Sequence, residues 1–183
     1  MNVFVLNSGR CGSMTFAKAC RHITNYTSGH ETRVRELGRS RVAYPENHIE
    51  SDCRLSYFLG RLDEAYGVTA YYVHLQRNRK ACVQSWKKRL GPRCIINAHA
   101  VGVLMRYGFK KIYDRSEPYI ADYIDSLNEN IRCFLRHKPK KMEFSLENAK
   151  TDFTTFWYDI GAEGDLKAAL AEWDIKHNAS RGK

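Results

Sequence analysis

The hydrophobic positions of the chain change period several times along its length. Residues 3–6 are four bulky apolar side chains in a row, which is typical of a strand buried on both faces of a parallel sheet. Residues 69–75 form a second strand-like apolar run, and residues 142–146 are predicted as a further parallel strand. Elsewhere apolar residues recur every three or four positions, which predicts helices. The predicted helices are residues 13–23, 52–66, 81–90, 98–107, 116–137, 152–160 and 165–173, with a short strand expected at 42–44.

Alternation of strands with helices along a chain is typical of an α/β domain of three layers with a central, mainly parallel sheet. The chain has 183 residues, of which 43% are hydrophobic. A chain of this size buries about two-thirds of its unfolded surface in one core. We therefore expect a single domain over residues 1–183.

Positive charge is in excess, with 30 Lys and Arg against 20 Asp and Glu and a net charge of +10. Such an excess favours an anionic ligand or partner. The basic residues are scattered, and no nucleic-acid-binding motif accompanies them. A nucleotide with several anionic groups would explain part of this positive charge, and we therefore expect no nucleic-acid partner. The charge alone equally allows a basic nucleic-acid-binding module.

The six cysteines are spread without C-x-x-C pairs, which argues against a zinc site and against a disulfide framework. We expect no metal. The sequence also has no secretory leader and no run of about 18 apolar residues. The expectation is a cytoplasmic protein that does not associate with membranes.

The segment that follows the first predicted strand, residues 7–14, contains two glycines and is called the cradle loop below. Gly9 and Gly12 allow backbone conformations and close approaches that a Cβ would block, and Ser13 is a suitable cap for the next helix. Backbone amides at the start of that helix would favour an anion, and Arg10 adds a positive charge. No Lys follows Gly12 as it would in a Walker A loop, which disfavours ATP or GTP hydrolysis. A simple strand-to-helix turn would contain the same glycines.

A second strand and helix repeat this design. Arg77 directly follows the strand at residues 69–75, and Ser85 lies about two helical turns further on. Because ligands bind at the carboxyl ends of parallel strands, both side chains can face one anion there.

Together the two units resemble the sulfotransferases that use 3′-phosphoadenosine 5′-phosphosulfate (PAPS). Arg10-Cys-Gly-Ser-Met14 matches the basic residue, variable residue, Gly and Ser/Thr of the family's 5′-phosphosulfate loop. Arg77 and Ser85 match the Arg, and the Ser eight positions later, that hold the 3′-phosphate. The resemblance implies a P-loop NTPase-like fold with PAPS as co-substrate. The residues that it assigns to PAPS are Gly9, Arg10, Cys11, Gly12, Ser13, Met14, Arg77 and Ser85, with Arg10 also catalytic.

The same resemblance implies a proton acceptor about twenty residues beyond the cradle loop. Glu31 is the expected base, and His30 is the neighbouring alternative. Either group could take the proton of an attacking alcohol if it lay within hydrogen-bond reach. Solvated loop residues would look the same in the sequence. Glu46, His48 and Glu50 form a second cluster, which would supply the base if Glu31 does not.

One departure from the family concerns the 3′-phosphate. Cytosolic sulfotransferases carry an Arg-Lys-Gly tripeptide that also grips this group, and no such tripeptide occurs here. Arg181-Gly-Lys183 is too close to the end of the chain to replace it. Nucleotide affinity is therefore expected to depend more heavily on Arg77 and Ser85.

The expected activity is transfer of a sulfuryl group from PAPS to a hydroxyl or amine of a small-molecule or carbohydrate acceptor. No feature of the sequence selects the acceptor or an oligomeric state. Two alternatives stay open. A P-loop-type small-molecule kinase would need ATP and Mg²⁺, and a nucleic-acid-binding module would show affinity that falls steeply with salt.

Overall fold

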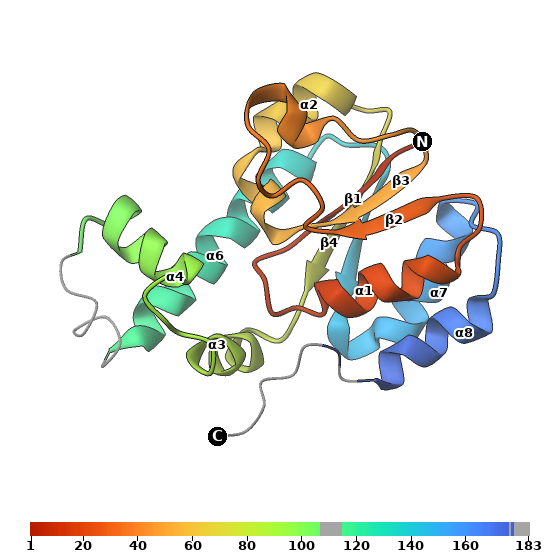
Figure 1. Cartoon of the computed structure of the whole chain (residues 1–183). Coiled ribbons are helices and arrows are strands. Elements are labelled where there is room, and N and C mark those ends of the chain that lie inside the picture. The colour runs from red at the N-terminus through yellow and green to blue at the C-terminus, as the bar shows by residue number, and fades with distance from the viewer. Residues whose placement is uncertain (107–114, 176, 178–183) are drawn as a thin grey trace.

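Strand β1 (Val3–Leu6) lies at the centre of a five-stranded sheet in the computed structural model, which describes residues 1–106, 115–175 and 177 (Figure 1). The strand order is β2-β3-β1-β4-β5, and every pair of neighbours is parallel. Val5 is paired in register with Ser51 on one side and with Val73 on the other. The other strands are β2 (Thr27–His30), β3 (His48–Ser51), β4 (Tyr71–Gln76) and β5 (Lys141–Ser145).

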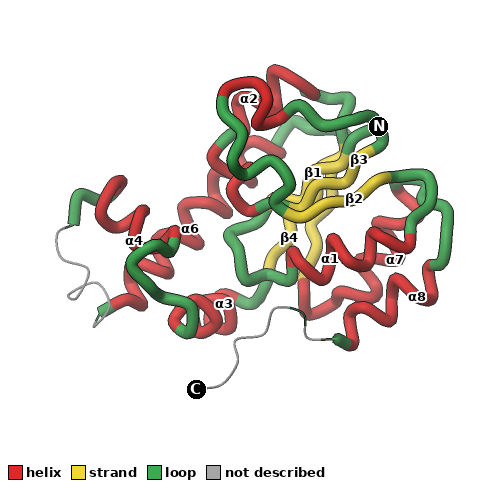
Figure 2. The backbone as a smooth tube through the Cα atoms, in the orientation of Figure 1, coloured by secondary structure: helices red, strands yellow, loops and turns green. Residues whose placement is uncertain are grey.

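Helices cover both faces of the sheet (Figure 2). One face carries α1 (Ser13–Ala19), α7 (Ala149–Asp159) and α8 (Leu166–Ala171), and the other carries α2 (Leu59–Tyr66) and α6 (Ser116–Leu135). The helices α3 (Arg79–Lys87) and α4 (Ile95–Ala98) follow β4. The expected α/β class with a parallel sheet between helical layers is confirmed, and the sheet is parallel throughout.

Strand β1 is buried on both faces, as its uninterrupted apolar run predicts. Its four side chains are fully buried. Val3 and Val5 belong to the core that includes Phe156 of α7. Phe4 and Leu6 belong to the core of α2 and the second half of α6. Successive side chains of a strand point to opposite faces, so this one strand joins the two cores.

All five strands run in the same direction, so their carboxyl ends meet at one edge of the sheet. The segments that leave this edge begin at Asn7, Glu31, Asp52, Arg77 and Leu146. Ligands of open parallel sheets bind at such an edge. This edge therefore positions the site described below.

Several predicted elements need correction. The strand expected at 42–44 is wrong, because Val42 ends a 3₁₀ segment (Gly38–Val42). Strands β2 and β3 were not predicted. The helix expected at 52–66 is divided into a 3₁₀ turn (Cys53–Tyr57) and α2, because Ser56 Oγ donates to the backbone oxygen of Asn7 at 3.2 Å and ties the turn to the cradle loop.

The remaining predicted helices are found with shifted ends. The segment expected at 98–107 contains the end of α4 and a π-helical turn (His99–Val103), and residue 107 lies outside the described residues. Residues 181–183 also lie outside them. Among the described residues, no helix is both long and apolar enough to span a membrane.

Candidate functional site

Three residues of the cradle loop have positive φ angles. The φ angles are +78° at Gly9, +60° at Arg10 and +95° at Gly12. Asn7 Oδ1 accepts a hydrogen bond from the Gly9 amide at 2.8 Å. The buried thiols of Cys11 and Cys82 donate to the Gly9 carbonyl at 3.1 and 3.3 Å. The loop is thus fixed from within and by α3.

Both glycines of the loop lie against neighbouring side chains. A Cβ on Gly9 would lie 2.6 Å from Trp86 Cζ2, and a Cβ on Gly12 would lie 2.7 Å from Leu146 Cδ1. The loop therefore packs directly against α3 on one side and against the segment after β5 on the other. Arg10 also has a left-handed backbone, which is a strained conformation for a residue other than glycine.

The cradle loop and the second strand-helix unit meet around a cavity of about 660 Å³, here called cavity A. Arg10 Nε donates to Ser85 Oγ at 3.1 Å, and Arg77 Nη1 donates to the Arg10 carbonyl at 3.2 Å. Lys88 adds a third basic side chain to the wall. The lining residues that the structure describes include no Asp or Glu. They are Arg10, Gly12, Ser13, Met14, Thr15, Arg77, Ala81, Gln84, Ser85, Lys88, Leu146, Trp173, Ile175 and His177.

Positive charge is concentrated at Arg10. Partial burial, followed by the neighbouring charges of Arg89 and Arg77, lowers the pKa of the Arg10 guanidinium. Like charges in one place disfavour the ionised form, and a bound anion would relieve that repulsion. Cavity A thus has the electrostatics of an anion site.

Ser13 does not cap α1. The residue before the helix is Gly12, and no side chain caps it. Ser13 Oγ instead lies 3.2 Å from His30 Nε2 at the end of β2. This contact links the cradle loop to one of the two expected bases.

A second cavity of about 280 Å³, here called cavity B, lies beside the first. Gly9, Arg10 and Ser13 line it from the cradle loop. Both expected bases, His30 and Glu31, also line it. Arg10 and Ser13 are therefore shared between cavities A and B, so the two cavities meet at the cradle loop.

Glu31 is engaged by its neighbours. Arg54 Nη1 lies 2.6 Å from the Glu31 carboxylate, and Cys53 Sγ donates to it at 3.7 Å. The backbone of Glu31 is left-handed, with φ +55°. Its carboxylate is held in place by an ion pair, whereas the imidazole of His30 contacts the loop directly.

The second acidic cluster lines neither cavity. Glu46 is exposed before the amino end of β3, on the opposite edge of the sheet from the cradle loop. Glu50 is fully buried, with Oε2 at 3.0 Å from His48 Nε2 and Oε1 accepting from the Thr32 amide at 2.8 Å. Burial alone would raise the pKa of Glu50, but these hydrogen bonds outweigh it and lower the pKa. His48 and Glu50 are thus engaged in contacts within β3 and with the residues of β2 and the segment after it.

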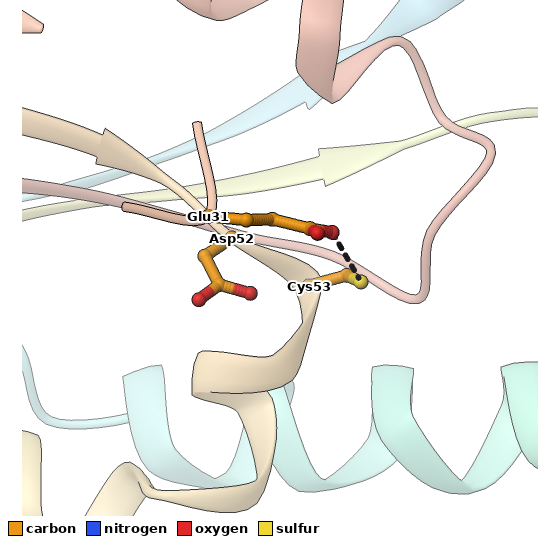
Figure 3. Close-up of side chains that lie close together, drawn as sticks. All are labelled: Glu31, Asp52 and Cys53. Carbon is orange, nitrogen blue, oxygen red and sulfur yellow. Dashed lines mark hydrogen bonds between the residues drawn. The ribbon is translucent and has the colours of Figure 1, made fainter. Parts of the chain in front are cut away.

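Glu31, Asp52 and Cys53 bring three potential metal ligands within 4.8 Å of one another (Figure 3). The donors do not suit a metal ion. Arg54 holds Glu31, and Arg41 forms a buried ion pair with Asp52. Burial raises the pKa of the Cys53 thiol well above its usual range, whereas a metal binds the thiolate. In Figure 3 the carboxylate of Glu31 points toward Cys53 while that of Asp52 points away.

Sequence reasoning placed Arg10, Ser13, Arg77 and Ser85 at one site, and the structure brings them together. Gly12 and Met14 also line cavity A, whereas Gly9 lines cavity B and the side chain of Cys11 is buried. The prediction did not include the basic residues Arg54, Lys88, Arg89 and Arg93, which line one cavity or the other. A signal was present at 87–89, a run of three basic residues directly after Ser85 and Trp86.

Comparisons of the chain with family models, with curated proteins and with solved structures give no match. Function is therefore inferred from the residues and geometry of the site.

Proposed function

We propose that this protein is a PAPS-dependent sulfotransferase built on a P-loop NTPase-like architecture. The observation that carries the proposal is the meeting of two basic units at the carboxyl edge of the sheet, where Arg10 and Ser85 are hydrogen-bonded at 3.1 Å. One unit is the cradle loop after the central strand, and the other is β4 with α3. PAPS has two separate anionic groups, and each unit would hold one of them.

The chemical character of cavity A suits such a ligand. Arg77 and Ser85 would bind the 3′-phosphate, since a guanidinium and a hydroxyl both donate to phosphate oxygens. Arg10, Ser13 and the backbone of the cradle loop would bind the 5′-phosphosulfate. Trp173 and Leu146 line the same cavity and offer apolar surface to the nucleoside.

PAPS would supply a sulfuryl group joined to a good leaving group. The acceptor oxygen forms a bond to sulfur while the bond from sulfur to the bridging oxygen breaks. The electron pair of that bond leaves on the phosphate of 3′-phosphoadenosine 5′-phosphate (PAP). Arg10 stabilises the negative charge that grows on the bridging oxygen, which is the kind of preorganised contact that accelerates such reactions most.

The acceptor's proton goes to a group in cavity B. The position of His30 supports this role, because its Nε2 lies 3.2 Å from Ser13 Oγ, which lines both cavities. Glu31 is the second candidate, and its ion pair with Arg54 competes for the lone pairs that would accept the proton. We therefore assign proton removal to His30 and give Glu31 the role of positioning Arg54.

A kinase is disfavoured by the residue after Gly12, which is Ser13 where a Walker A loop has Lys. Among the described lining residues of cavity A, the lysine is Lys88, which directly follows α3. A kinase of the Walker type would hold Mg²⁺ and the β- and γ-phosphates through the loop lysine and its Ser/Thr neighbour.

Thermal unfolding in the presence of nucleotides tests the proposal. PAP at a hundred times its dissociation constant should stabilise the fold by about 2.7 kcal/mol, which raises the midpoint by several degrees in a domain of this size. Adenosine 5′-phosphate and ATP with Mg²⁺ serve as comparison ligands. Stabilisation by ATP alone, or by none of the three, would contradict the proposal.

Arg77→Ala and Arg79→Ala form a matched pair of variants. Each variant removes one arginine from the few residues after β4. Arg79, however, is paired with Asp125 on the surface and lines neither cavity. Arg77→Ala should abolish most of the shift caused by PAP, and Arg79→Ala should keep it. Equal shifts in the two variants would remove Arg77 from the nucleotide site.

A further inference from the structure

Cys11 and Cys82 form a pair of buried thiols beside Gly9. Their sulfur atoms are 3.9 Å apart, although the two residues are separated by 71 positions in the chain. Each thiol donates a hydrogen bond to the same acceptor, the Gly9 carbonyl, at 3.1 and 3.3 Å. Cys11 belongs to the cradle loop and Cys82 to α3. The thiol pair therefore connects the two units that meet at cavity A.

The other cysteines are not arranged in this way. Among the residues that the structure describes, no other two sulfur atoms lie within hydrogen-bond distance of each other. Burial raises the pKa of the Cys20 thiol and of the Cys53 thiol, which disfavours the thiolate that reacts with oxidants. Cys11 and Cys82 are thus the two cysteines placed to react with each other.

The two thiols of the pair differ in acidity. The hydrogen bond from Cys11 lowers the pKa of Cys82, and the charge of Arg77 acts in the same direction against the effect of burial. The pKa of Cys11 is raised by its hydrogen bond with Cys82 and by burial. A thiol of lowered pKa beside a second thiol is the arrangement in which oxidation ends in a disulfide. Cys82 is therefore the attacking thiol and Cys11 the resolving thiol.

We infer that Cys11 and Cys82 form a reversible oxidation site, at which a peroxide joins the two sulfur atoms in a disulfide and thereby weakens binding in cavity A. With hydrogen peroxide, the Cys82 sulfur attacks one oxygen, the O–O bond breaks, and a sulfenic acid and water form. The Cys11 sulfur then attacks the sulfenic sulfur, the S–O bond breaks, and the hydroxyl leaves with the proton of Cys11 as a second water. Two thiols thus lose two protons and two electrons, and one peroxide is reduced to two waters.

The disulfide would disturb the cradle loop for two reasons. It has no S–H group, so the Gly9 carbonyl would lose both of its thiol donors. The sulfur atoms must also approach from 3.9 Å to about 2.0 Å. Gly9 is already packed against Trp86, with 2.6 Å between an added Cβ and Cζ2. The loop would have to shift relative to α3, and the hydrogen bond between Arg10 and Ser85 joins the same two elements.

Burial restricts the oxidants that can reach this pair. Both side chains are about 1% exposed. Gly9, whose carbonyl contacts both thiols, lines cavity B, which gives a molecule as small as hydrogen peroxide an approach. A bulky oxidant such as oxidised glutathione should instead react with Cys133, which is exposed.

Peptide mapping tests the oxidation site directly. Trypsin cleaves after Arg10, Lys18, Lys80 and Lys87, so Cys11 and Cys82 fall in separate peptides, residues 11–18 and 81–87, each with a single cysteine. After treatment of the reduced protein with hydrogen peroxide and alkylation of the remaining thiols, mass spectrometry should find these two peptides linked. Dithiothreitol should release them. Oxidised glutathione should give a mixed disulfide at Cys133 and little of the linked pair.

Two variants and a binding measurement test the consequence. The oxidised protein should bind PAP about tenfold more weakly or worse, because hydrogen bonds to a buried acceptor are lost, and dithiothreitol should restore the affinity. Cys82→Ser keeps a donor for Gly9 but cannot form the disulfide, so peroxide should leave its affinity for PAP unchanged. Cys133→Ser, which removes the exposed thiol, should respond to peroxide as the unmodified protein does.

The outcomes separate this inference from the proposed function. If PAP does not stabilise the reduced protein, the proposed function fails, and the peptide map still decides whether the thiol pair is an oxidation site. If peroxide leaves both thiols open to alkylation, or oxidises them without linking the two peptides, the inference is overturned. A linked protein that binds PAP as tightly as the reduced protein would also overturn it, because the disulfide would then not act on cavity A.

Discussion

Arg10 and Ser85 are 75 positions apart in the chain, and the guanidinium Nε of one donates a 3.1 Å hydrogen bond to the hydroxyl of the other. This bond joins the loop after β1 to the helix after β4. Arg77 strengthens the junction by donating to the Arg10 carbonyl at 3.2 Å. The two halves of the proposed nucleotide site are thus held together before any ligand binds, which reduces the ordering that binding requires.

Ser85→Ala tests the contribution of this junction to nucleotide binding. The variant should bind PAP about tenfold more weakly, because one hydrogen-bond partner of the 3′-phosphate is lost. Calorimetric titration gives the dissociation constant. Ser28→Ala, whose hydroxyl bonds to the Ala17 carbonyl and which lines neither cavity, is the control. Unchanged affinity in Ser85→Ala would place the 3′-phosphate elsewhere.

Two substitutions of Arg10 separate its chemistry from its backbone. Arg10→Ala and Arg10→Gly both remove the guanidinium, so turnover should fall on the order of a hundredfold or more in each. The left-handed φ of +60° costs alanine but not glycine. Urea unfolding should therefore find Arg10→Gly more stable than Arg10→Ala by about 1 kcal/mol. Equal stabilities would show that the loop relaxes when the arginine is removed.

The contact between Gly9 and Trp86 predicts a steric cost that a matched glycine does not share. Gly161 has a φ of +63° and no atom within 4 Å of an added Cβ, while Gly9 has a φ of +78° and Trp86 Cζ2 at 2.6 Å. Gly161→Ala should cost about 1 kcal/mol of unfolding free energy through its backbone alone. Gly9→Ala should cost about 1–3 kcal/mol more, because a methyl group is forced into a packed wall. Chemical denaturation of both variants measures the difference.

The proton acceptor is distinguished by the turnover of His30→Gln and Glu31→Gln. His30→Gln should lower kcat by about 10²- to 10⁴-fold, because the group that takes the acceptor's proton is lost. Glu31→Gln should cause a smaller loss of rate, through release of Arg54 from its ion pair. The reverse pattern would transfer the base to Glu31.

Glu50 predicts an acid-sensitive contribution to stability. Its folded pKa is lowered, because hydrogen bonds from His48 and Thr32 outweigh the effect of burial. A carboxylate with a depressed pKa stabilises the fold above its unfolded pKa, and this stability is lost as the pH falls through the folded pKa. Between about pH 5 and pH 3, urea midpoints should therefore fall less in Glu50→Gln than in the unmodified protein. Glu36→Gln, at an exposed position, should follow the unmodified protein.

The hydrophobic pattern predicts the central strands β1 and β4 well, but it does not predict β2 and β3 on one side of the sheet. Strands β1 and β4 are nearly continuous apolar runs, and burial on both faces leaves a clear pattern. Strand β3 reads His-Ile-Glu-Ser and is also buried. Its Glu50 and His48 pair with each other, and Glu50 also accepts a hydrogen bond from the Thr32 hydroxyl, so these two polar side chains are buried together with their partners. A hydrophobic pattern contains no information about such pairing.

The same limit applies to the site. Arg77 and Ser85 could be placed because both belong to one local strand-helix unit with fixed spacing. Arg54 and Arg93 could not, since they come from different connections that meet only when the strands are ordered β2-β3-β1-β4-β5. A basic residue in a loop looks the same in the sequence whether it faces solvent or a cavity.

Ser85 and Trp86 are consecutive residues of α3, yet the first lines cavity A and the second lines cavity B. Under the proposed function, the nucleotide and the acceptor would therefore contact adjacent side chains of one helix. Trp86 also packs against Gly9 of the cradle loop, so a substitution at position 86 should disturb both binding pockets at once.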